Sequence, residues 1–202
     1  MKTFSGISDE IQKAAWEVVR RNEIVKAWEK IGAKVCVVGS LATGLLAKRR
    51  DIDLHAYTSL LDAKNGFSAM AEIAKGGNIK SCSFLDLSST REECMEWHAV
   101  VRGPDDADWS IDIINIKTAS PFDGYFEETA RIIKKSLTAQ LRETILQLKF
   151  SEPENENIPG ISYCRAVIED SVKTPEEMLD WHRNHPLAGI DMWRPEIKPA
   201  KG

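Results

Sequence analysis

The sequence lacks the features that mark membrane-spanning, secreted and disulfide-stabilised proteins. No apolar run approaches the roughly 18 residues that a membrane-spanning helix requires, and residues 1–6 contain no apolar core of the signal-peptide type. The chain has only four cysteines, and no two of them form a C-x-x-C pair, so reduced thiols are expected. These absences predict a cytoplasmic protein that does not bind a membrane.

The sequence also lacks an excess of positive charge. Its 27 lysines and arginines are outnumbered by 31 aspartates and glutamates, and the net charge at pH 7 is −4. Because binding to duplex nucleic acid depends on a basic surface, this balance argues against duplex nucleic acid as the main partner. The 202 residues contain no internal repeat, and 43% of them are hydrophobic, which is enough for one domain with a buried core.

What the sequence does contain is one strongly patterned stretch, residues 35–57. Val35 to Val38 is a short β-branched apolar run that ends at Gly39. This pattern predicts a buried strand followed by a tight turn. A short segment with helical propensity follows over residues 41–47, before a second patterned run begins.

The second run, residues 51–57, alternates between polar and apolar side chains, as a half-buried strand does. Because side chains i, i+2 and i+4 of a strand share a face, Asp51, Asp53 and His55 point in one direction. Two carboxylates on one face of a core strand are costly to bury unless something neutralises them. A divalent metal such as Mg²⁺ is the usual partner, because it prefers carboxylate oxygens.

This stretch resembles the signature of the DNA polymerase β-like nucleotidyltransferase superfamily. The signature is Gly-Ser or Gly-Gly, a spacer, and then Asp-x-Asp flanked by apolar residues; here it reads G-S over residues 39–40 and D-I-D-L over residues 51–54. Ala42 and Gly44 extend the match to the G-S-x-A-x-G of the small bacterial members. Those members include antibiotic nucleotidyltransferases and minimal enzymes that modify partner proteins.

The resemblance also requires a third carboxylate on a strand beside Asp-x-Asp, and Asp112 fits that requirement. Residues 96–102 and 109–117 read as two strands around the turn G-P-D-D-A, which predicts an antiparallel hairpin. Trp109 and Ile111 share one face of the second strand, and Asp112 points to the other. An aspartate inside a run as apolar as W-S-I-D-I-I-N-I is expected to have a function.

The resemblance assigns roles to these residues. Three carboxylates on neighbouring strands would hold two Mg²⁺ ions and serve as both catalytic residues and metal ligands: Asp51, Asp53 and Asp112. A second set would contact the triphosphate of the nucleotide: Gly39, Ser40, Lys48, Arg49 and Arg50. Gly39 would let the backbone approach the phosphates closely. Alternatively, Lys48, Arg49 and Arg50 belong to a loop that is exposed to solvent and does not contact the nucleotide.

The implied activity is transfer of a nucleoside monophosphate, expected to be AMP from ATP, to a hydroxyl of a small-molecule acceptor. A protein acceptor is the nearest enzymatic alternative. A third alternative is an interaction module that keeps the fold without turnover, and it is favoured by Thr43, which stands where the small members usually carry arginine. The presence of all three carboxylates favours the enzyme, because a pure binder does not need three uncompensated negative charges at one point.

The whole pattern predicts an α/β (α+β) fold: a mixed, mostly antiparallel sheet of four or five strands with helices on one face. We expect residues 1–150 to form the nucleotidyltransferase core and residues 151–202 to form a linker and a C-terminal helical addition, because the chain turns acidic and proline-containing after residue 150. Ser8 is expected to cap the first helix. One long helix is expected over residues 124–150.

The sequence leaves two interpretations open for the basic residues of the expected long helix, and two for His98. The expected long helix carries four basic residues that form either a solvated face or a source of one or two phosphate contacts: Arg131, Lys135, Arg142 and Lys149. His98 is expected roughly opposite Asp112 in the hairpin. Either it packs against its neighbours or it takes part in the chemistry.

Overall fold

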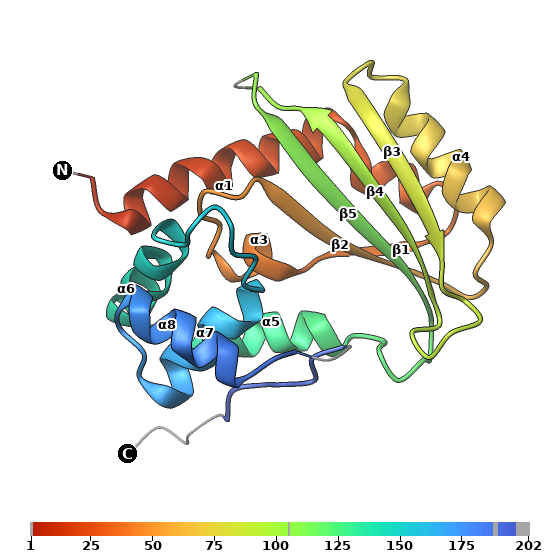
Figure 1. The fold of residues 1–202 in the computed structure, drawn as a ribbon. Coiled ribbons are helices and arrows are strands. Elements are labelled where there is room, and N and C mark those ends of the chain that lie inside the picture. Colours follow the sequence, from red (N-terminus) through yellow and green to blue (C-terminus); the bar gives the residue numbers. More distant parts are fainter. Residues whose placement is uncertain (1, 105, 188–189, 197–202) are drawn as a thin grey trace.

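Five strands form one sheet in the order β1-β2-β5-β4-β3 (Figure 1). The computed structural model describes residues 2–104, 106–187 and 190–196. The strands are β1 (Lys34–Val37), β2 (Asp51–Thr58), β3 (Ile79–Asp86), β4 (Cys94–Arg102) and β5 (Asp108–Lys117). β2 and β5 are parallel, whereas the other neighbouring strands are antiparallel. The predicted mixed, mostly antiparallel sheet is therefore confirmed.

The helices are α1 (Phe4–Arg21), α2 (Ile24–Glu29), α3 (Gly39–Thr43), α4 (Ala63–Ala74), α5 (Tyr125–Ser136), α6 (Ala139–Phe150), α7 (Gly160–Asp170) and α8 (Pro175–Asn184). The apolar sides of α1, α2 and α4 pack with one face of the sheet into a single core, in which Trp28, Trp97 and Trp109 are fully buried. This core takes the strand residues that the alternation predicts to point inward. Within the described residues, no helix has the length and apolar character to cross a bilayer.

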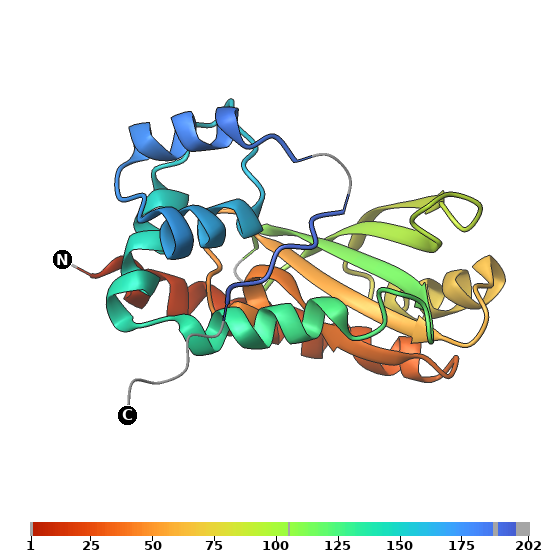
Figure 2. The ribbon, with the colours of Figure 1, turned by 90° about the horizontal axis from the view of Figure 1, so that it is seen from below.

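A second apolar cluster holds the C-terminal helices. It joins Leu45, from the segment before β2, to Ile145 of α6, Val167 of α7 and Trp181 of α8. Figure 2 shows these helices beside one end of the sheet. The cluster contains residues from both sides of position 150, and the division of the chain into a core and an addition at that point stays a prediction.

The first helix begins earlier than the prediction placed it. Thr3 is its N-cap and accepts a hydrogen bond from the backbone N–H of Gly6. Ser8 lies inside the helix, fully buried, and donates to the backbone oxygen of Leu46 over 2.6 Å. Thr3 and Ser8 are both good capping residues. Because the Ser8 hydroxyl donates to Leu46, Ser8 lies inside the helix and Thr3 is the N-cap.

The long helix expected over residues 124–150 is divided into α5 and α6. Leu137 takes an extended conformation, with φ −74° and ψ 114°. Thr138 then caps α6 by accepting from the backbone N–H of Leu141. The prediction of one helix was wrong. The apolar periodicity continues through the break and so suggests a single helix, but Thr138 is the N-cap of a second helix.

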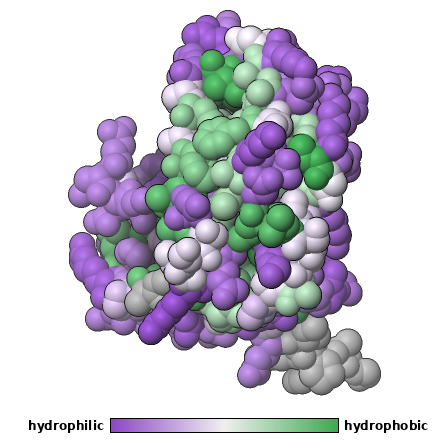
Figure 3. Space-filling model, turned by 90° about the vertical axis from the view of Figure 1, so that its right-hand side faces the viewer, coloured by the Kyte–Doolittle hydropathy of each residue, from purple (hydrophilic) through white to green (hydrophobic). Residues whose placement is uncertain are grey.

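The outer strand β3 leaves one edge of the sheet uncovered by another strand. On the face of the molecule that contains α4 and β3, hydrophobic residues are scattered among hydrophilic ones (Figure 3). Phe67 of α4 is 47% exposed and Leu85 of β3 is 49% exposed. Such singly exposed apolar side chains are normal on soluble proteins.

Candidate active site

The pairing of β2 with β5 brings the three predicted carboxylates together. In this parallel pair, Asp53 stands opposite Asp112, and Asp51 stands opposite Ser110. Ile52 and Leu54 of β2 are completely buried in the core on the opposite face. Because side chains alternate along a strand, all three carboxylates lie on the face that points away from this core.

The Gly39-Ser40 turn lies directly against Asp53. The backbone N–H of Val38 donates to the backbone oxygen of Asp53 over 2.9 Å. Gly39 has a φ of +61°, and a Cβ at this position would stand 2.0 Å from Oδ2 of Asp53. Only glycine fits here, because both the backbone conformation and the lack of space exclude a side chain.

Gly39→Ala is therefore expected to displace Asp53 and to lower the stability of the protein. Gly77 is the matched control, because its φ is +70° and nothing lies within 4 Å of its Cβ position. Gly77→Ala should cost about 1 kcal/mol of unfolding free energy through backbone strain. Gly39→Ala should cost roughly 1–3 kcal/mol more than this control, because overpacking is added. Equal losses in urea denaturation would contradict the close contact.

The electrostatics of the site fit a bound cation. Burial, followed by the charges of Asp51 and Asp112, raises the pKa of Asp53 to about 7, while Lys149 acts in the opposite direction. No lysine or arginine among the described residues forms an ion pair with Asp51 or Asp53. Asp51 and Asp53 thus lie beside each other without a lysine or arginine of the described chain as an ion-pair partner.

Lys149 of α6 is the cation that lies beside the turn. Its Nζ donates to Oγ of Ser40 and to the backbone oxygen of Leu45, each over 2.8 Å. Burial lowers its pKa, and the charges of Asp51 and Asp53 partly offset that effect. Among the basic residues expected on one helix face, Arg131 instead pairs with Glu128, and Arg142 pairs with Asp9.

Thr43, which stands where the resemblance leads one to expect arginine, packs inside the protein. It is buried, with an exposed fraction of 7%, and its hydroxyl donates to the backbone oxygens of Gly39 and Ser40 over 3.1 and 3.2 Å. It therefore stabilises the turn from within α3. The positive charge beside the turn comes from Lys149, which is distant in the sequence.

The cations that precede β2 contact the segment before α7. Lys48 donates to the backbone oxygen of Glu152, and Arg49 donates to the Glu152 carboxylate and to the side chain of Asn157. The guanidinium of Arg50 lies 5.5 Å from the centre of the Trp109 ring. The role that the resemblance implies for these three residues in nucleotide binding stays a prediction.

Arg49→Met should destabilise the protein, because it leaves a buried carboxylate without its positive partner. The Glu152 side chain is 4% exposed and the Arg49 side chain 39%. We expect a loss of about 1–3 kcal/mol of unfolding free energy, below the value for fully buried pairs because Arg49 is partly solvated. Urea denaturation of Arg49→Met, Glu152→Gln and the double variant would test the interaction between the two side chains. Strictly additive losses would show that the two side chains do not interact.

His98 connects the third carboxylate to the neighbouring strand. It pairs with Asp112 across the β4–β5 hairpin. Its Nδ1 lies 2.6 Å from Oδ1 of Asp112, and its Nε2 lies 3.1 Å from Oε2 of Glu96. Burial lowers the pKa of His98, but the hydrogen bonds to Asp112 and Glu96 outweigh that effect and raise it. The expected position of His98 opposite Asp112 is confirmed.

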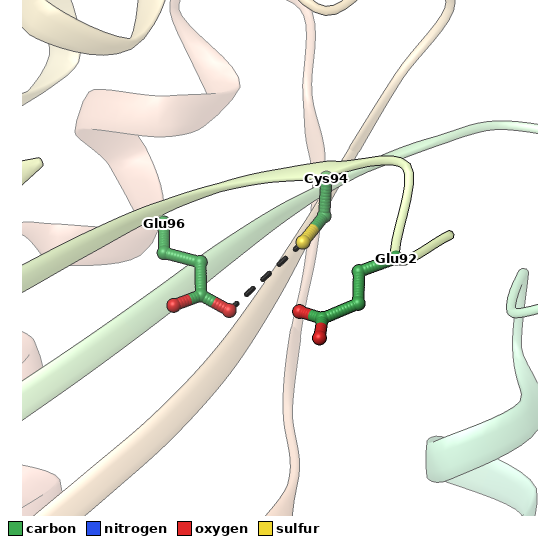
Figure 4. A group of neighbouring side chains, drawn as sticks. All are labelled: Glu92, Cys94 and Glu96. Carbon is green, nitrogen blue, oxygen red and sulfur yellow. Dashed lines mark hydrogen bonds between the residues drawn. The ribbon is translucent and has the colours of Figure 1, made fainter. Parts of the chain in front are cut away.

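Further acidic side chains lie on β4 and just before it, and the sequence reasoning missed them. Figure 4 shows Glu92, Cys94 and Glu96 around one point, with ligand atoms within 4.8 Å of one another. Burial, with the charges of Glu96 and Glu92, raises the pKa of the Cys94 thiol to about 12, so it is protonated at neutral pH. The signal was present: Cys94, Glu96 and His98 alternate along one strand and so share a face.

His55 and Tyr57 continue the carboxylate-bearing face of β2. Burial lowers the pKa of His55 to about 4, so its imidazole is neutral at physiological pH. The Tyr57 hydroxyl donates to both oxygens of Glu127 on α5, over 2.7 and 2.9 Å. These contacts fasten α5 to the sheet beside the carboxylates.

The three carboxylates line a cleft of about 660 Å³. Polar groups of β4 line one side of it, and apolar side chains from α5, α7 and the segments near them line another: Phe122, Phe126, Ile133, Ile161 and Leu187. Within the described residues, no lysine or arginine lines this cleft. The cleft thus combines an acidic floor with an apolar wall.

The sequence matches no protein-family model and no curated protein. Solved structures do match it. The Cid1 poly(U) polymerase with MgGTP bound superposes with a TM-score of 0.55 and 16% identity, over 81% of this chain and 54% of the other. The complex of the non-canonical poly(A) polymerase GLD-2 with GLD-3 superposes with a TM-score of 0.54 and 14% identity, over 92% of this chain and 64% of the other. A cytoplasmic RNA terminal U-transferase superposes with a TM-score of 0.50 and 18% identity, over 81% of this chain and 52% of the other.

This protein spans about half the length of the Cid1 chain that it resembles. At these identities the likeness concerns the fold alone. It agrees with the signature of residues 39–54 and with the mixed sheet that carries it. The chain therefore has the nucleotidyltransferase fold of these solved structures.

Proposed function

We propose that this protein is a magnesium-dependent nucleotidyltransferase, which moves a nucleoside monophosphate, expected to be AMP, from a nucleoside triphosphate to a hydroxyl group. The observation that carries the proposal is the register that places Asp53 opposite Asp112. With Asp51 on the same face, this register assembles three carboxylates against the Gly39-Ser40 turn. The fold supports the proposal, since the solved structures of this fold include the Cid1 poly(U) polymerase with magnesium nucleotides bound.

The donor set fits Mg²⁺. Asp51, Asp53 and Asp112 offer only carboxylate oxygens, which Mg²⁺ prefers. Burial and the charges of Asp51 and Asp112 raise the pKa of Asp53, so a cation bound here would stabilise its ionised form. These residues would hold two ions. When bound, the ions neutralise phosphate charge and make the acceptor hydroxyl more acidic.

The protein's own residues have distinct tasks in this reaction. Lys149 supplies positive charge beside the turn and holds Oγ of Ser40, which leaves the Ser40 O–H available to donate to a phosphate oxygen. The acceptor oxygen forms a bond to the α-phosphorus, and the bond from this phosphorus to the β-phosphate oxygen breaks. The hydroxyl proton passes to the Asp112 carboxylate, and pyrophosphate leaves.

The acceptor that the cleft favours is a small molecule. A nucleic-acid strand is a polyanion and is normally held by a basic groove, whereas the described lining of this cleft has no lysine or arginine and includes Glu92 and Glu96. RNA is the second candidate, because the solved structures that match include an RNA terminal U-transferase, a poly(U) polymerase and a poly(A) polymerase. A protein acceptor is the third.

Labelled nucleotides would test the reaction and sort the acceptors. The purified protein is incubated with Mg²⁺, cell lysate and ATP labelled at the α-phosphate, and the products are separated into small-molecule, RNA and protein fractions. We expect label in the small-molecule fraction that depends on the added protein, and no such protein-dependent label with EDTA or with γ-labelled ATP. The other three ribonucleotides are tested in the same way. Label in RNA or protein would correct the acceptor.

The inactive interaction module is tested by ligand binding together with the transfer assay. An active site should bind Mg²⁺ and ATP together, so the melting temperature should rise more with both than with either. No Mg²⁺-dependent gain with any of the four ribonucleotides, together with no transfer, would favour the interaction module and refute the enzyme.

A further inference from the structure

The three carboxylates of the site are not held alike. Within the part of the chain that the structure describes, the side chains of Asp51 and Asp53 accept no side-chain hydrogen bond, whereas Oδ1 of Asp112 lies 2.6 Å from Nδ1 of His98. A carboxylate only accepts hydrogen bonds, so Nδ1 carries the hydrogen in this contact. A charge-assisted bond of this length is among the stronger ones in proteins.

The His98 ring is itself fixed at its other nitrogen. Nε2 lies 3.1 Å from Oε2 of Glu96, which is two residues earlier on β4 and so lies on the same face. The His98 side chain is 42% exposed. That exposure argues against a role in packing and leaves the two carboxylate contacts as the ring's main interactions.

We propose that His98 is a positioning residue for Asp112: its Nδ1–H holds Oδ1, and Glu96 holds the ring, so that the Asp112 carboxylate has one orientation in the cleft. Oδ2 of Asp112 makes no hydrogen bond within the described residues and is the oxygen left for metal and acceptor. This inference rests on the proposed function, in which Asp112 acts on the acceptor hydroxyl.

The physical basis is the freedom of an aspartate side chain. The terminal torsion of a carboxylate is broad, so an unrestrained Asp112 would sample many orientations. A histidine that holds a metal-binding carboxylate removes this freedom before the substrate arrives. Loss of such outer partners typically costs about 10- to 100-fold in metal affinity or activity.

Three variants separate positioning from other roles. His98→Ala removes the donor. His98→Asn places an amide N–H near the position of Nδ1 and restores it. Ser83→Ala, at the residue of β3 that pairs with His98, is the control for a change on this part of the sheet.

We expect His98→Ala to lower kcat by about 10- to 100-fold and to raise the Mg²⁺ concentration at half-maximal rate. The KM for ATP should change by less than about threefold, because the triphosphate contacts are intact. His98→Asn should recover most of the loss, and Ser83→Ala should behave as the wild type. The melting temperature without metal reports whether each variant folds.

Binding measurements keep this inference separate from the proposed function. Melting temperatures with Mg²⁺ and ATP should show a smaller joint gain for His98→Ala than for the wild type. A wild type with neither transfer nor joint stabilisation would overturn the proposed function and this inference with it. A functional wild type with an unchanged His98→Ala, or with His98→Asn no better than His98→Ala, would overturn the inference alone.

Discussion

Asp53→Asn is expected to abolish nucleotidyl transfer and, without metal, to make the protein more stable at neutral pH. Activity is lost because the variant removes the carboxylate at the centre of the group, between Asp51 and the paired Asp112. Stability rises because burial and the charges of Asp51 and Asp112 disfavour the ionised form of Asp53, whose pKa is raised from 3.8 to about 7. A shift of this size corresponds to roughly 4 kcal/mol at full ionisation.

The pH dependence has a definite sign. A carboxyl group with a raised pKa binds its proton more tightly in the folded state, so its ionisation destabilises the fold. The unfolding free energy of the metal-free wild type should therefore fall as the pH rises from about 4 to about 7, the range between the two pKa values. Asp53→Asn should lack this decrease. Urea denaturation in EDTA at pH 5 and pH 8 measures the unfolding free energies of the wild type and of Asp53→Asn. An equal change of unfolding free energy between the two pH values in both proteins would contradict the prediction.

Lys149→Met should reduce transfer by about 10²- to 10³-fold, because it removes the positive charge beside the phosphate-binding turn. It should also raise the pKa of Asp53 further. Burial, Asp51 and Asp112 already raise that pKa, and Lys149 is the group that lowers it. The decrease in stability of the metal-free protein should thus extend to higher pH in Lys149→Met than in the wild type.

The control for this variant is Lys134→Met, which removes an exposed lysine from α5. It should leave transfer and the pH profile unchanged. If Lys149→Met keeps wild-type turnover, or if its pH profile does not move, the lysine only packs against the turn. A loss of the same size in Lys134→Met would point to a general effect of net charge instead.

The strands and the carboxylate positions could be predicted because they depend on local alternation. Asp53 lies between Ile52 and Leu54, and Asp112 lies between Ile111 and Ile113, so period-two patterning alone places each carboxylate opposite the core. The pairing of β2 with β5 could not be read from this pattern. It joins segments that are distant in the sequence, and only the resemblance to a known signature suggested it.

The parts of the site that the sequence did not yield depend on tertiary contacts. Lys149 approaches Ser40 only because α6 is separated from α5 at Leu137 and packs against the segment before β2. Glu96 becomes relevant only once His98 lies between it and Asp112. The first arrangement has no local signal, because it is decided by which faces of distant elements meet. The second has one, since Glu96 and His98 alternate along β4, but its importance depends on the contact of His98 with Asp112.

β5 pairs with β2 on one side and with β4 on the other, and this limits where residues can be inserted or deleted during evolution. Loss of one residue between Asp108 and Asp112 would turn the carboxylate toward the core that Ile111 now fills, because side chains alternate along the strand. The turn beyond the last pair, Arg102 with Asp108, is free of this constraint. Insertions and deletions in descendants of this chain should therefore accumulate in that turn and be absent from β5.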